Sequence, residues 1–382
     1  MIEEIFSIAI LLFFAKILGE FFRRLDFSPI IGEILAGIIL GPAVLNLVKN
    51  SQQLSILSNL GIVFLFFLIG LSTEIEEIEK NVFNAGVIVI FGDLLALIAC
   101  FVCAVLLGFN YLSSFAIAVA LIGSSTAISI RYLAEIGELH KRYAKTLITG
   151  NLIDDVFVTL LLSVLIAHIT NTPLDIWQAL TIVLAIIGFF FFVLKFGSFV
   201  SDPITDMIAK MKDEQALIAV LIAIMFFIAA ISDRIEIAIV TGAFLAGAIF
   251  SNTKYTEQVI IPKIKTIGYA LFIPVFFAYS GLSVNLIFLS SFLGVVYLII
   301  FCFMRCFFEY IGIERMSRLF GFDEQEARGM GLGMLPLGEF TIVVAQISLA
   351  NNIISNNIFS VLVMSVMVTT IATPIIFKLT YH

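Results

Sequence analysis

Long apolar runs alternate with short polar breaks along the whole sequence. A helix needs about 20 apolar residues to cross a bilayer, and thirteen runs of this kind can be delimited. The breaks are too short for a soluble domain, so the pattern predicts an all-α polytopic membrane protein with a single transmembrane domain over residues 1–382. The expected spans are residues 5–22, 28–47, 54–72, 83–109, 112–134, 143–169, 176–200, 214–232, 236–251, 262–282, 286–312, 325–350 and 357–379.

Composition supports a membrane location. The chain is 61% hydrophobic and 13% charged, whereas a soluble domain carries roughly 25% charged residues. The net charge of −7 and the lack of a basic patch argue against nucleic acid as a partner. The first run follows the acidic start MIEEI and has no small-residue cleavage site, so we interpret it as a span and not as a signal peptide. The four cysteines lie in apolar runs and predict neither disulfides nor a metal site.

Basic residues fall unevenly on the two sides of the predicted spans. Of the 21 lysines and arginines, 17 lie in the loops of one side and two in the loops of the other. Under the positive-inside rule, this asymmetry places the N-terminus outside and the C-terminus inside a cell membrane.

A short motif recurs at a fixed offset. Residues 32–39 (GEILAGII) resemble residues 242–249 (GAFLAGAI), 210 positions later, and Phe66-Phe67 recurs at the same offset as Phe276-Phe277. The offset equals seven spans, an odd number, so the second copy crosses the membrane in the opposite direction. We therefore expect two inverted six-helix repeats joined by a linker helix, a design typical of transporters. The expected bounds are 1–172, 173–210 and 211–382.

Two segments at matched positions should interrupt their helices. Residues 123–129 (GSSTAIS) are polar and β-branched in the middle of a span, and residues 333–339 (GMLPLGE), at the repeat offset, contain glycine and proline. Such residues break the hydrogen-bond ladder of a helix. The pattern predicts a pair of crossed discontinuous helices.

Two adjacent carboxylates, Asp154 and Asp155, lie within the apolar run that starts at GNLIDDVFVT. On a helix they point about 100° apart. Asn151 and Thr159 lie four residues before and after Asp155, so these three share one face. Their oxygens suit a monovalent cation such as Na+, and Asp154 is a second candidate ligand. Backbone carbonyls near the interruption can add further oxygens, at Ser124, Ser125 and Thr126.

Burial disfavours the charged form of a carboxylate, so Asp155 needs either a proton or a bound cation. If only one fits, the two compete, and a site that faces each side in turn exchanges cations for protons. Asp155 is therefore the expected ion and proton site.

Arg305 lies deep in a span, and a buried guanidinium requires a partner. Asp154 is the first candidate and Glu339 the second; both a purely structural pair and a role in coupling remain open. Asp93, in the fourth span, is either a gate residue or a packing residue. Lys16 and Glu20, four residues apart, are expected to pair.

Together these motifs resemble the bacterial and archaeal sodium/proton antiporters of the cation:proton antiporter superfamily, in the branch with an Asp-Asp pair. The resemblance runs from about residue 28 to 345. The segments that carry it are 28–37 (SPIIGEILAG) with 40–42 (LGP), 67–71 (FLIGL), 242–247 (GAFLAG), 274–277 (PVFF) with Gly281-Leu282, and 336–340 (PLGEF).

The resemblance implies a secondary transporter and not an enzyme, without a cofactor. It further implies a mobile core domain and a dimerisation domain that move in an elevator-like way within lipid. It also implies that Asp155 carries the ion and that Asp154 pairs with Arg305. Two positions depart from the family pattern. Relatives usually carry lysine where this chain has Arg305, and arginine where it has Leu337. Because arginine keeps its proton, any route that uses a lysine proton is closed here, which leaves the stoichiometry open.

Other functions are weighed against this one. A K+/H+ antiporter fits the same residues, although the nucleotide-binding domain of Kef-type potassium systems is not expected, since no G-x-G-x-x-G is present. An ion-gated sensor or channel fits an inverted repeat less well. An intramembrane aspartyl protease needs two aspartates that converge from separate helices, which adjacent residues do not provide.

Overall fold

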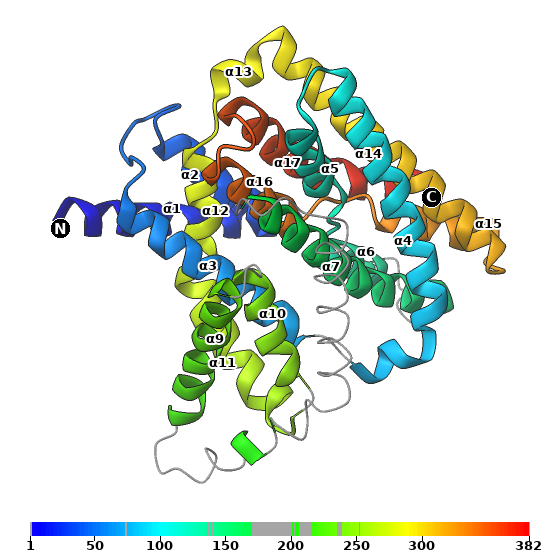
Figure 1. Ribbon diagram of the computed structural model, residues 1–382, viewed down its shortest axis with the longest axis horizontal. Helices are drawn as coiled ribbons and strands as arrows, with labels where there is room; N and C mark the ends of the chain where they lie inside the picture. The colour runs from blue at the N-terminus through cyan, green and yellow to red at the C-terminus, as the bar shows by residue number, and fades with distance from the viewer. Residues whose placement is uncertain are drawn as a thin grey trace. The chain divides into compact units, whose positions relative to one another are not determined.

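The chain is helical over nearly all of the residues that the structure describes (Figure 1). The computed structural model describes residues 2–72, 75–135, 138, 141–169, 201, 203–205, 215–234, 239–251 and 253–381. The helices are α1 (Ile2–Arg24), α2 (Pro29–Leu40), α3 (Gln52–Leu71), α4 (Ile75–Leu106), α5 (Tyr111–Ile122), α6 (Thr126–Glu135), α7 (Arg142–Ile169), α9 (Ala216–Arg234), α10 (Ile239–Ile249), η1 (Thr256–Ile260), α11 (Ile261–Ile267), η2 (Gly268–Phe272), α12 (Ile273–Leu282), α13 (Leu286–Ser290), α14 (Phe292–Leu319), α15 (Glu324–Gly333), α16 (Glu339–Ala350) and α17 (Asn356–Tyr381).

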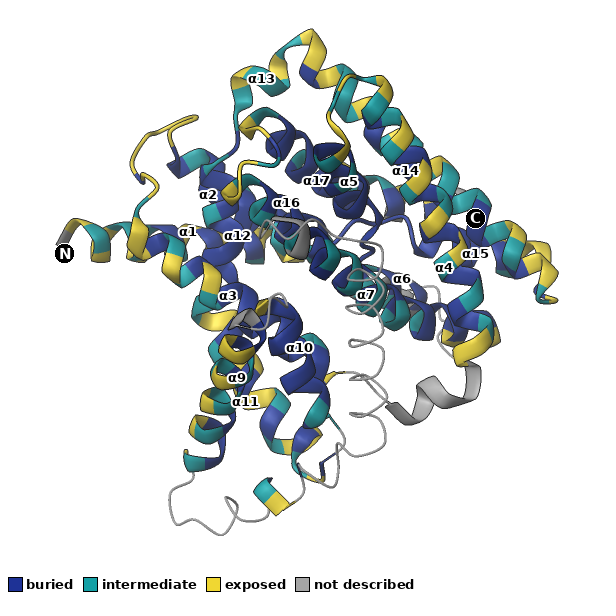
Figure 2. Ribbon diagram, viewed as in Figure 1, coloured by how far each residue is buried: buried dark blue, intermediate teal, exposed yellow. Residues whose placement is uncertain are grey.

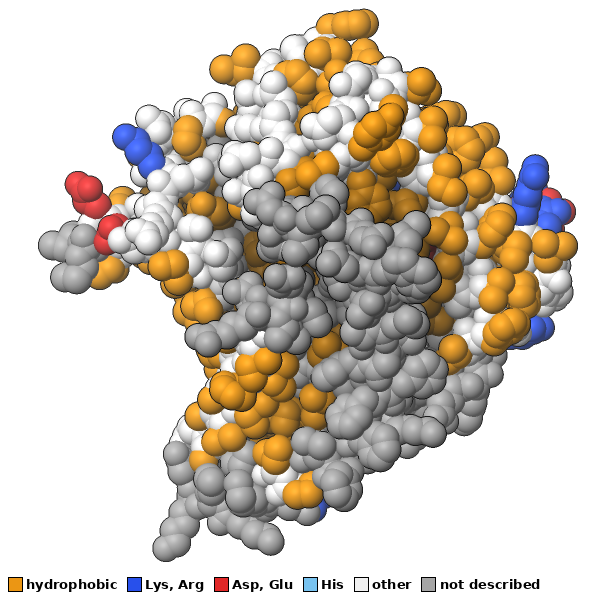
Figure 3. Space-filling view, in the orientation of Figure 1, with side chains coloured by type: hydrophobic (Ala, Val, Ile, Leu, Met, Phe, Trp, Pro, Cys, Tyr) orange, Lys and Arg blue, Asp and Glu red, His pale blue; other side chains and the backbone are white. Residues whose placement is uncertain are grey.

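The helices confirm the predicted all-α membrane architecture. Within the described ranges, seven helices are long and apolar enough to cross a membrane, and five shorter ones are also apolar. The expected span 176–200 lies outside the described residues, and each of the other expected spans contains at least one helix. Large apolar side chains remain exposed on helices such as α1, α4 and α14 (Figures 2 and 3). In a bilayer, lipid chains cover such surfaces.

The described residues divide into two compact units. The first comprises residues 51–78 and 159–276, and the second comprises residues 2–50, 79–158 and 277–382. In the first unit, α3 packs against α10 so closely that a Cβ on Gly70 would meet the Phe244 carbonyl, and one on Gly247 would meet the Phe67 carbonyl. Glycine is required where two backbones approach in this way.

The second unit contains an equivalent close contact between α2 and α12. A Cβ on Gly37 would meet the Ala278 carbonyl, and one on Gly281 would meet the Ile34 carbonyl. Gly37 and Gly247 occupy the same place in the recurring motif, 210 residues apart, whereas Gly281 follows Gly70 by 211 residues, one position out of step with the recurring phenylalanine pair. In each unit, therefore, a helix from the first half of the sequence packs against a helix from the second half. The pairs are α3 with α10 and α2 with α12.

The predicted pair of interrupted helices is confirmed in the second unit. The first interruption separates α5 from α6, and the second separates α15 from α16. Ser124 and Leu337 form an isolated antiparallel bridge between the two extended segments. The Ser125 N–H donates to the Pro336 carbonyl (2.8 Å), and the Gly338 N–H donates to the Gly123 carbonyl (3.3 Å). Each segment thus satisfies backbone groups that the other leaves open, as burial requires.

The ion pair expected between Lys16 and Glu20 is wrong. Lys16 pairs with Glu33 of α2 at 3.0 Å, whereas Glu20 pairs with Arg23 and Arg24 on its own helix. Helix α2 packs directly on α1, with Gly32 against the backbone at Leu18, and this contact nearly buries Glu33. An unpaired charge on Glu33 would therefore cost more than one on the more exposed Glu20.

Candidate functional site

The two adjacent aspartates lie in the middle of α7. Asp154 is fully buried and Asp155 is 6% exposed. Asn151 and Thr159, one turn before and one turn after Asp155, are buried too. Since successive residues of a helix point about 100° apart, the two carboxyl groups face different surroundings.

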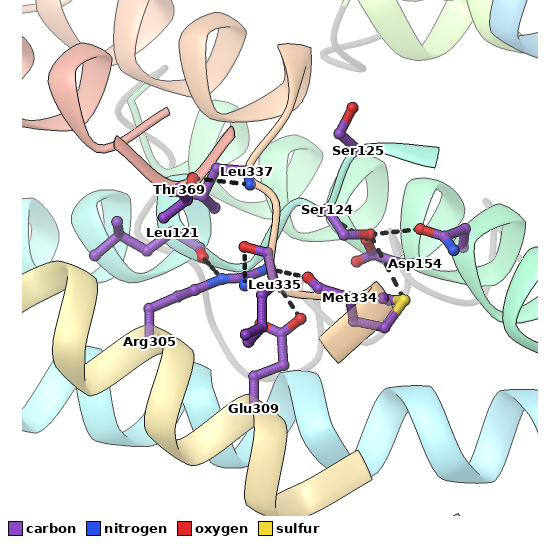
Figure 4. A network of polar contacts seen from close by, with 12 residues as sticks. Leu121, Ser124, Ser125, Asp154, Arg305, Glu309, Met334, Leu335, Leu337 and Thr369 are labelled. Carbon is purple, nitrogen blue, oxygen red and sulfur yellow. Dashed lines mark hydrogen bonds and ion pairs between the residues drawn. The ribbon is translucent and has the colours of Figure 1, made fainter. Parts of the chain in front are cut away.

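Asp154 is fixed by the first helix interruption. Its Oδ2 atom accepts a hydrogen bond from the Ser124 N–H (2.9 Å) and a second, short one from the Ser124 hydroxyl (Figure 4). The Ser124 N–H is available because Gly123, Ser124 and Ser125 leave the helical path between α5 and α6. Bonds from N–H and O–H groups stabilise the charged form of a carboxylate. Asp154 therefore anchors α7 to the interruption.

The other predicted oxygen ligands surround the same interruption. The Ser124 hydroxyl also lies 2.9 Å from Asn151 Oδ1 and 3.9 Å from Met334 Sδ. With one proton it donates to only one of its three acceptors at a time. Asn151 Nδ2 donates to the Leu147 carbonyl (3.0 Å), which leaves its oxygen turned toward Ser124. Ser125 is buried, and the Thr126 hydroxyl oxygen is buried without a hydrogen-bond partner among the described residues. Asn151, Ser124 and Asp154 are thus brought together.

Arg305 of α14 binds both interruptions at once (Figure 4). Its Nε donates to the Leu121 carbonyl at the end of α5 (2.9 Å). Its Nη1 donates to the Leu335 carbonyl (2.6 Å), and its Nη2 to the Met334 carbonyl (2.8 Å), both in the second interruption. The last carbonyls of a helix have no partner within the helix and carry the negative end of its dipole. A guanidinium satisfies several of them with one positive charge.

The acidic partner of Arg305 is Glu309, and the pairing expected with Asp154 or Glu339 is not found. Arg305 Nη2 lies 2.9 Å from Glu309 Oε1, one turn along the same helix, and both side chains are fully buried. Asp154 does not need the guanidinium because Ser124 already supplies two donors. The sequence does contain the signal for Glu309: it lies four residues after Arg305, the spacing at which helical side chains meet.

Glu339 begins α16 directly after the second interruption. It forms no ion pair with any described residue. A carboxylate in the first turn of a helix is favoured by the helix dipole, and Glu339 is close enough to interact electrostatically with Asp155. Two threonines of α17 complete this interruption and were not anticipated. The Leu337 N–H donates to Thr369 Oγ1 (3.1 Å), and the Thr370 hydroxyl donates to the Leu337 carbonyl (3.3 Å).

The polar groups around the two interruptions are mostly oxygen atoms. Carboxylate, amide, hydroxyl and carbonyl oxygens are typical ligands of hard cations. Within the described ranges, no group of three or more histidine, cysteine, aspartate or glutamate side chains is arranged to hold a metal ion.

Comparison with known proteins identifies the kind of molecule. Residues 9–381 match the family described as "Sodium/hydrogen exchanger, transmembrane". The chain belongs to this family. The Na+/H+-K+ antiporter GerN of Bacillus cereus is 26% identical over 99% of this chain and 96% of its own length. The probable Na+/H+ antiporter GerT of the same organism is 30% identical over 91% of both chains.

A solved structure supports the fold. The sodium proton antiporter MjNhaP1 from Methanocaldococcus jannaschii superposes with a TM-score of 0.72, covering 98% of this chain and 96% of that one, at 14% sequence identity. This exchanger-family chain is therefore a multi-pass membrane transporter that exchanges monovalent cations for protons. It is not an enzyme, and its ions are cargo, so no cofactor is needed. The function predicted from the carboxylate pair and the interrupted helices is confirmed at this level.

Proposed function

We propose that Asp155 is the carboxyl group that binds a cation and a proton in turn, and that Na+ is the preferred cation. The division of work between the two aspartates carries this proposal. Asp154 already accepts two hydrogen bonds from Ser124 and serves as an anchor. Asp155 lies buried on another face of α7, and burial within a membrane makes the charged form of a carboxyl group costly. A proton or a cation removes that cost, and competition between them couples the two fluxes.

Side-chain oxygens of neighbouring residues are the candidate further ligands of a cation at Asp155. Asn151 and Thr159 share the face of α7 that carries Asp155, and the buried Thr126 hydroxyl lies at the start of α6. Li+ fits the same set. K+ is the second candidate, because the name of the relative GerN includes this ion.

Alternating access by an elevator-like movement is the mechanism that we infer for the exchange. The matched glycine contacts, Gly37 with Gly281 and Gly247 with Gly70, support two inverted repeats that exchange helices. In such a design, one bundle moves against the other around the ion site. We also infer a homodimer in the cell membrane. The distribution of lysine and arginine favours an external N-terminus and an internal C-terminus.

The test is exchange in proteoliposomes that contain the purified protein. Wild-type protein should move protons in response to Na+ or Li+, and Asp155→Asn should abolish this movement. Glu33→Gln is the matched control, since Glu33 is a buried acid outside the proposed site that already pairs with Lys16. Proton flux that persists in Asp155→Asn would refute the assignment. Proton flux driven by K+ alone would favour the second candidate.

A further inference from the structure

Asp93 is a fully buried carboxyl group that the proposed cation site does not use. It lies on α4, which packs between α7 and α14 in the second unit: Gly150 of α7 packs against Val89, and Gly92 packs against Ile313 and the Glu309 carbonyl of α14. Both carboxyl oxygens of Asp93 are buried without a hydrogen-bond partner among the described residues. A buried acid without a partner is costly when charged.

The charged groups that face Asp93 come from both helices packed against α4. Asp154 lies on α7, and Arg305 and Glu309 lie on α14; all three interact electrostatically with Asp93. The cluster therefore contains three carboxyl groups and a single guanidinium.

Arg305 has at most one further N–H group that could bind Asp93. Four of its five N–H groups bind the carbonyls of Leu121, Met334 and Leu335 and one oxygen of Glu309. Asp154 Oδ1 and Glu309 Oε2 are also buried without a partner within the described residues. With every acid ionised, the cluster would carry a net charge of about −2 in a medium where such charges repel strongly. At least one of the acids has to be neutral.

A proton neutralises this cluster better than a metal ion would. No set of three acidic, histidine or cysteine side chains converges on a metal position in the described part of the chain. Of the three acids, Asp154 accepts hydrogen bonds from Ser124 and Glu309 accepts one from Arg305, which leaves Asp93 as the acid with no donor among the described residues.

We propose that Asp93 binds a second exchangeable proton, which leaves when the cation binds near Asp155. A cation beside the cluster adds one positive charge, which makes ionisation of a nearby carboxyl easier. One proton then leaves Asp155 and one leaves Asp93, both to the aqueous side that the site faces. Two protons exchanged for one cation move one net charge per cycle. This inference rests on the proposed role of Asp155, and it restores a potential-dependent stoichiometry without any proton from Arg305.

The first experiment measures exchange in proteoliposomes at clamped membrane potentials. Wild-type exchange should change in rate with potential, whereas Asp93→Asn should still exchange Na+ for protons with a rate that no longer depends on potential. Asp93→Glu should restore the dependence. Glu33→Gln is the matched control, because Glu33 is a buried acid of the same unit that already has a cation, Lys16; its potential dependence should equal that of wild type.

Potential-independent exchange by the wild type, or unchanged potential dependence in Asp93→Asn, would overturn the inference. Absence of any cation-driven proton flux in the wild type would instead overturn the proposed function. A second measurement needs only the wild type, in case Asp93→Asn does not fold. Calorimetric Na+ titration in two buffers of different ionisation enthalpy counts the protons released. About two per bound cation support a coupled pair of acids, and about one refutes it.

Discussion

Arg305→Lys tests whether the guanidinium holds the two interrupted helices together. Arg305 makes three hydrogen bonds to backbone carbonyls from three different nitrogen atoms, in addition to its ion pair with Glu309. Lysine keeps the charge but has one nitrogen, so at least two buried carbonyls should lose their donor. Hydrogen bonds from a charged group contribute about 1.5–3 kcal/mol each, which gives a loss of about 3–6 kcal/mol of stability.

The assay is the thermal unfolding of purified protein in detergent, followed by the loss of the monodisperse peak. Arg305→Lys should unfold at a clearly lower temperature and should transport poorly, because the interruptions lose their common anchor. Arg23→Lys is the matched control: Arg23 pairs with Glu20 on the exposed surface, where ion pairs contribute about 0–1 kcal/mol. Its unfolding temperature should stay close to that of wild type. If Arg305→Lys unfolds at the same temperature as Arg23→Lys, Arg305 does not hold the interruptions together.

Two further predictions concern the anchor of Asp154 and the close helix contacts. Ser124→Ala removes one of the two donors to Asp154, so it should lower stability by about 1–3 kcal/mol and weaken Na+ binding. Unfolding measures the first effect and the Na+ dependence of exchange the second. A normal Na+ dependence would show that Ser124 does not anchor Asp154. Gly37→Ala and Gly247→Ala force a Cβ against a backbone carbonyl and should each destabilise by about 1–3 kcal/mol. Gly86→Ala is the control, because its new Cβ has only an ordinary contact, 3.5 Å from Ile153. This variant should express and unfold like wild type. If all three variants unfold at the same temperature, the close-contact glycines do not have the proposed role.

Much of the architecture was predictable because a bilayer imposes a strict length on apolar helices. The same logic predicted the interruptions at residues 123–129 and 333–339, since polar and proline-containing segments within spans are rare unless they serve a site. Helical periodicity predicted that Asn151 shares a face with Asp155, whereas the contact that the structure shows for the Asn151 oxygen is with Ser124, beside Asp154. These features are local, and local features are what a sequence displays most directly.

The partners of the charged residues were harder to predict because they depend on which side chains tertiary packing brings together. Asp154 was the first candidate partner of Arg305, yet one of its oxygens instead accepts a hydrogen bond from the Ser124 N–H, which is free only because α5 ends just before it. Similarly, Lys16 forms its ion pair with Glu33 of the neighbouring helix α2 and not with Glu20 of its own helix. Asp93 looked like either a gate or a packing residue, and its lack of partners became visible only with the helices in place.

The backbone bridge between Ser124 and Leu337 has a mechanical consequence. The two strands of the bridge belong to segments more than 200 residues apart in sequence, yet amide groups couple them directly, without relying on any particular side chain. A displacement of one interruption should therefore be transmitted to the other. The residues on either side of Leu337 form the bridge hydrogen bonds, and the N–H and carbonyl of Leu337 itself are bound by Thr369 and Thr370 of α17. The two bridged segments should therefore move together as one rigid unit, so that the proposed binding site can move without being rebuilt.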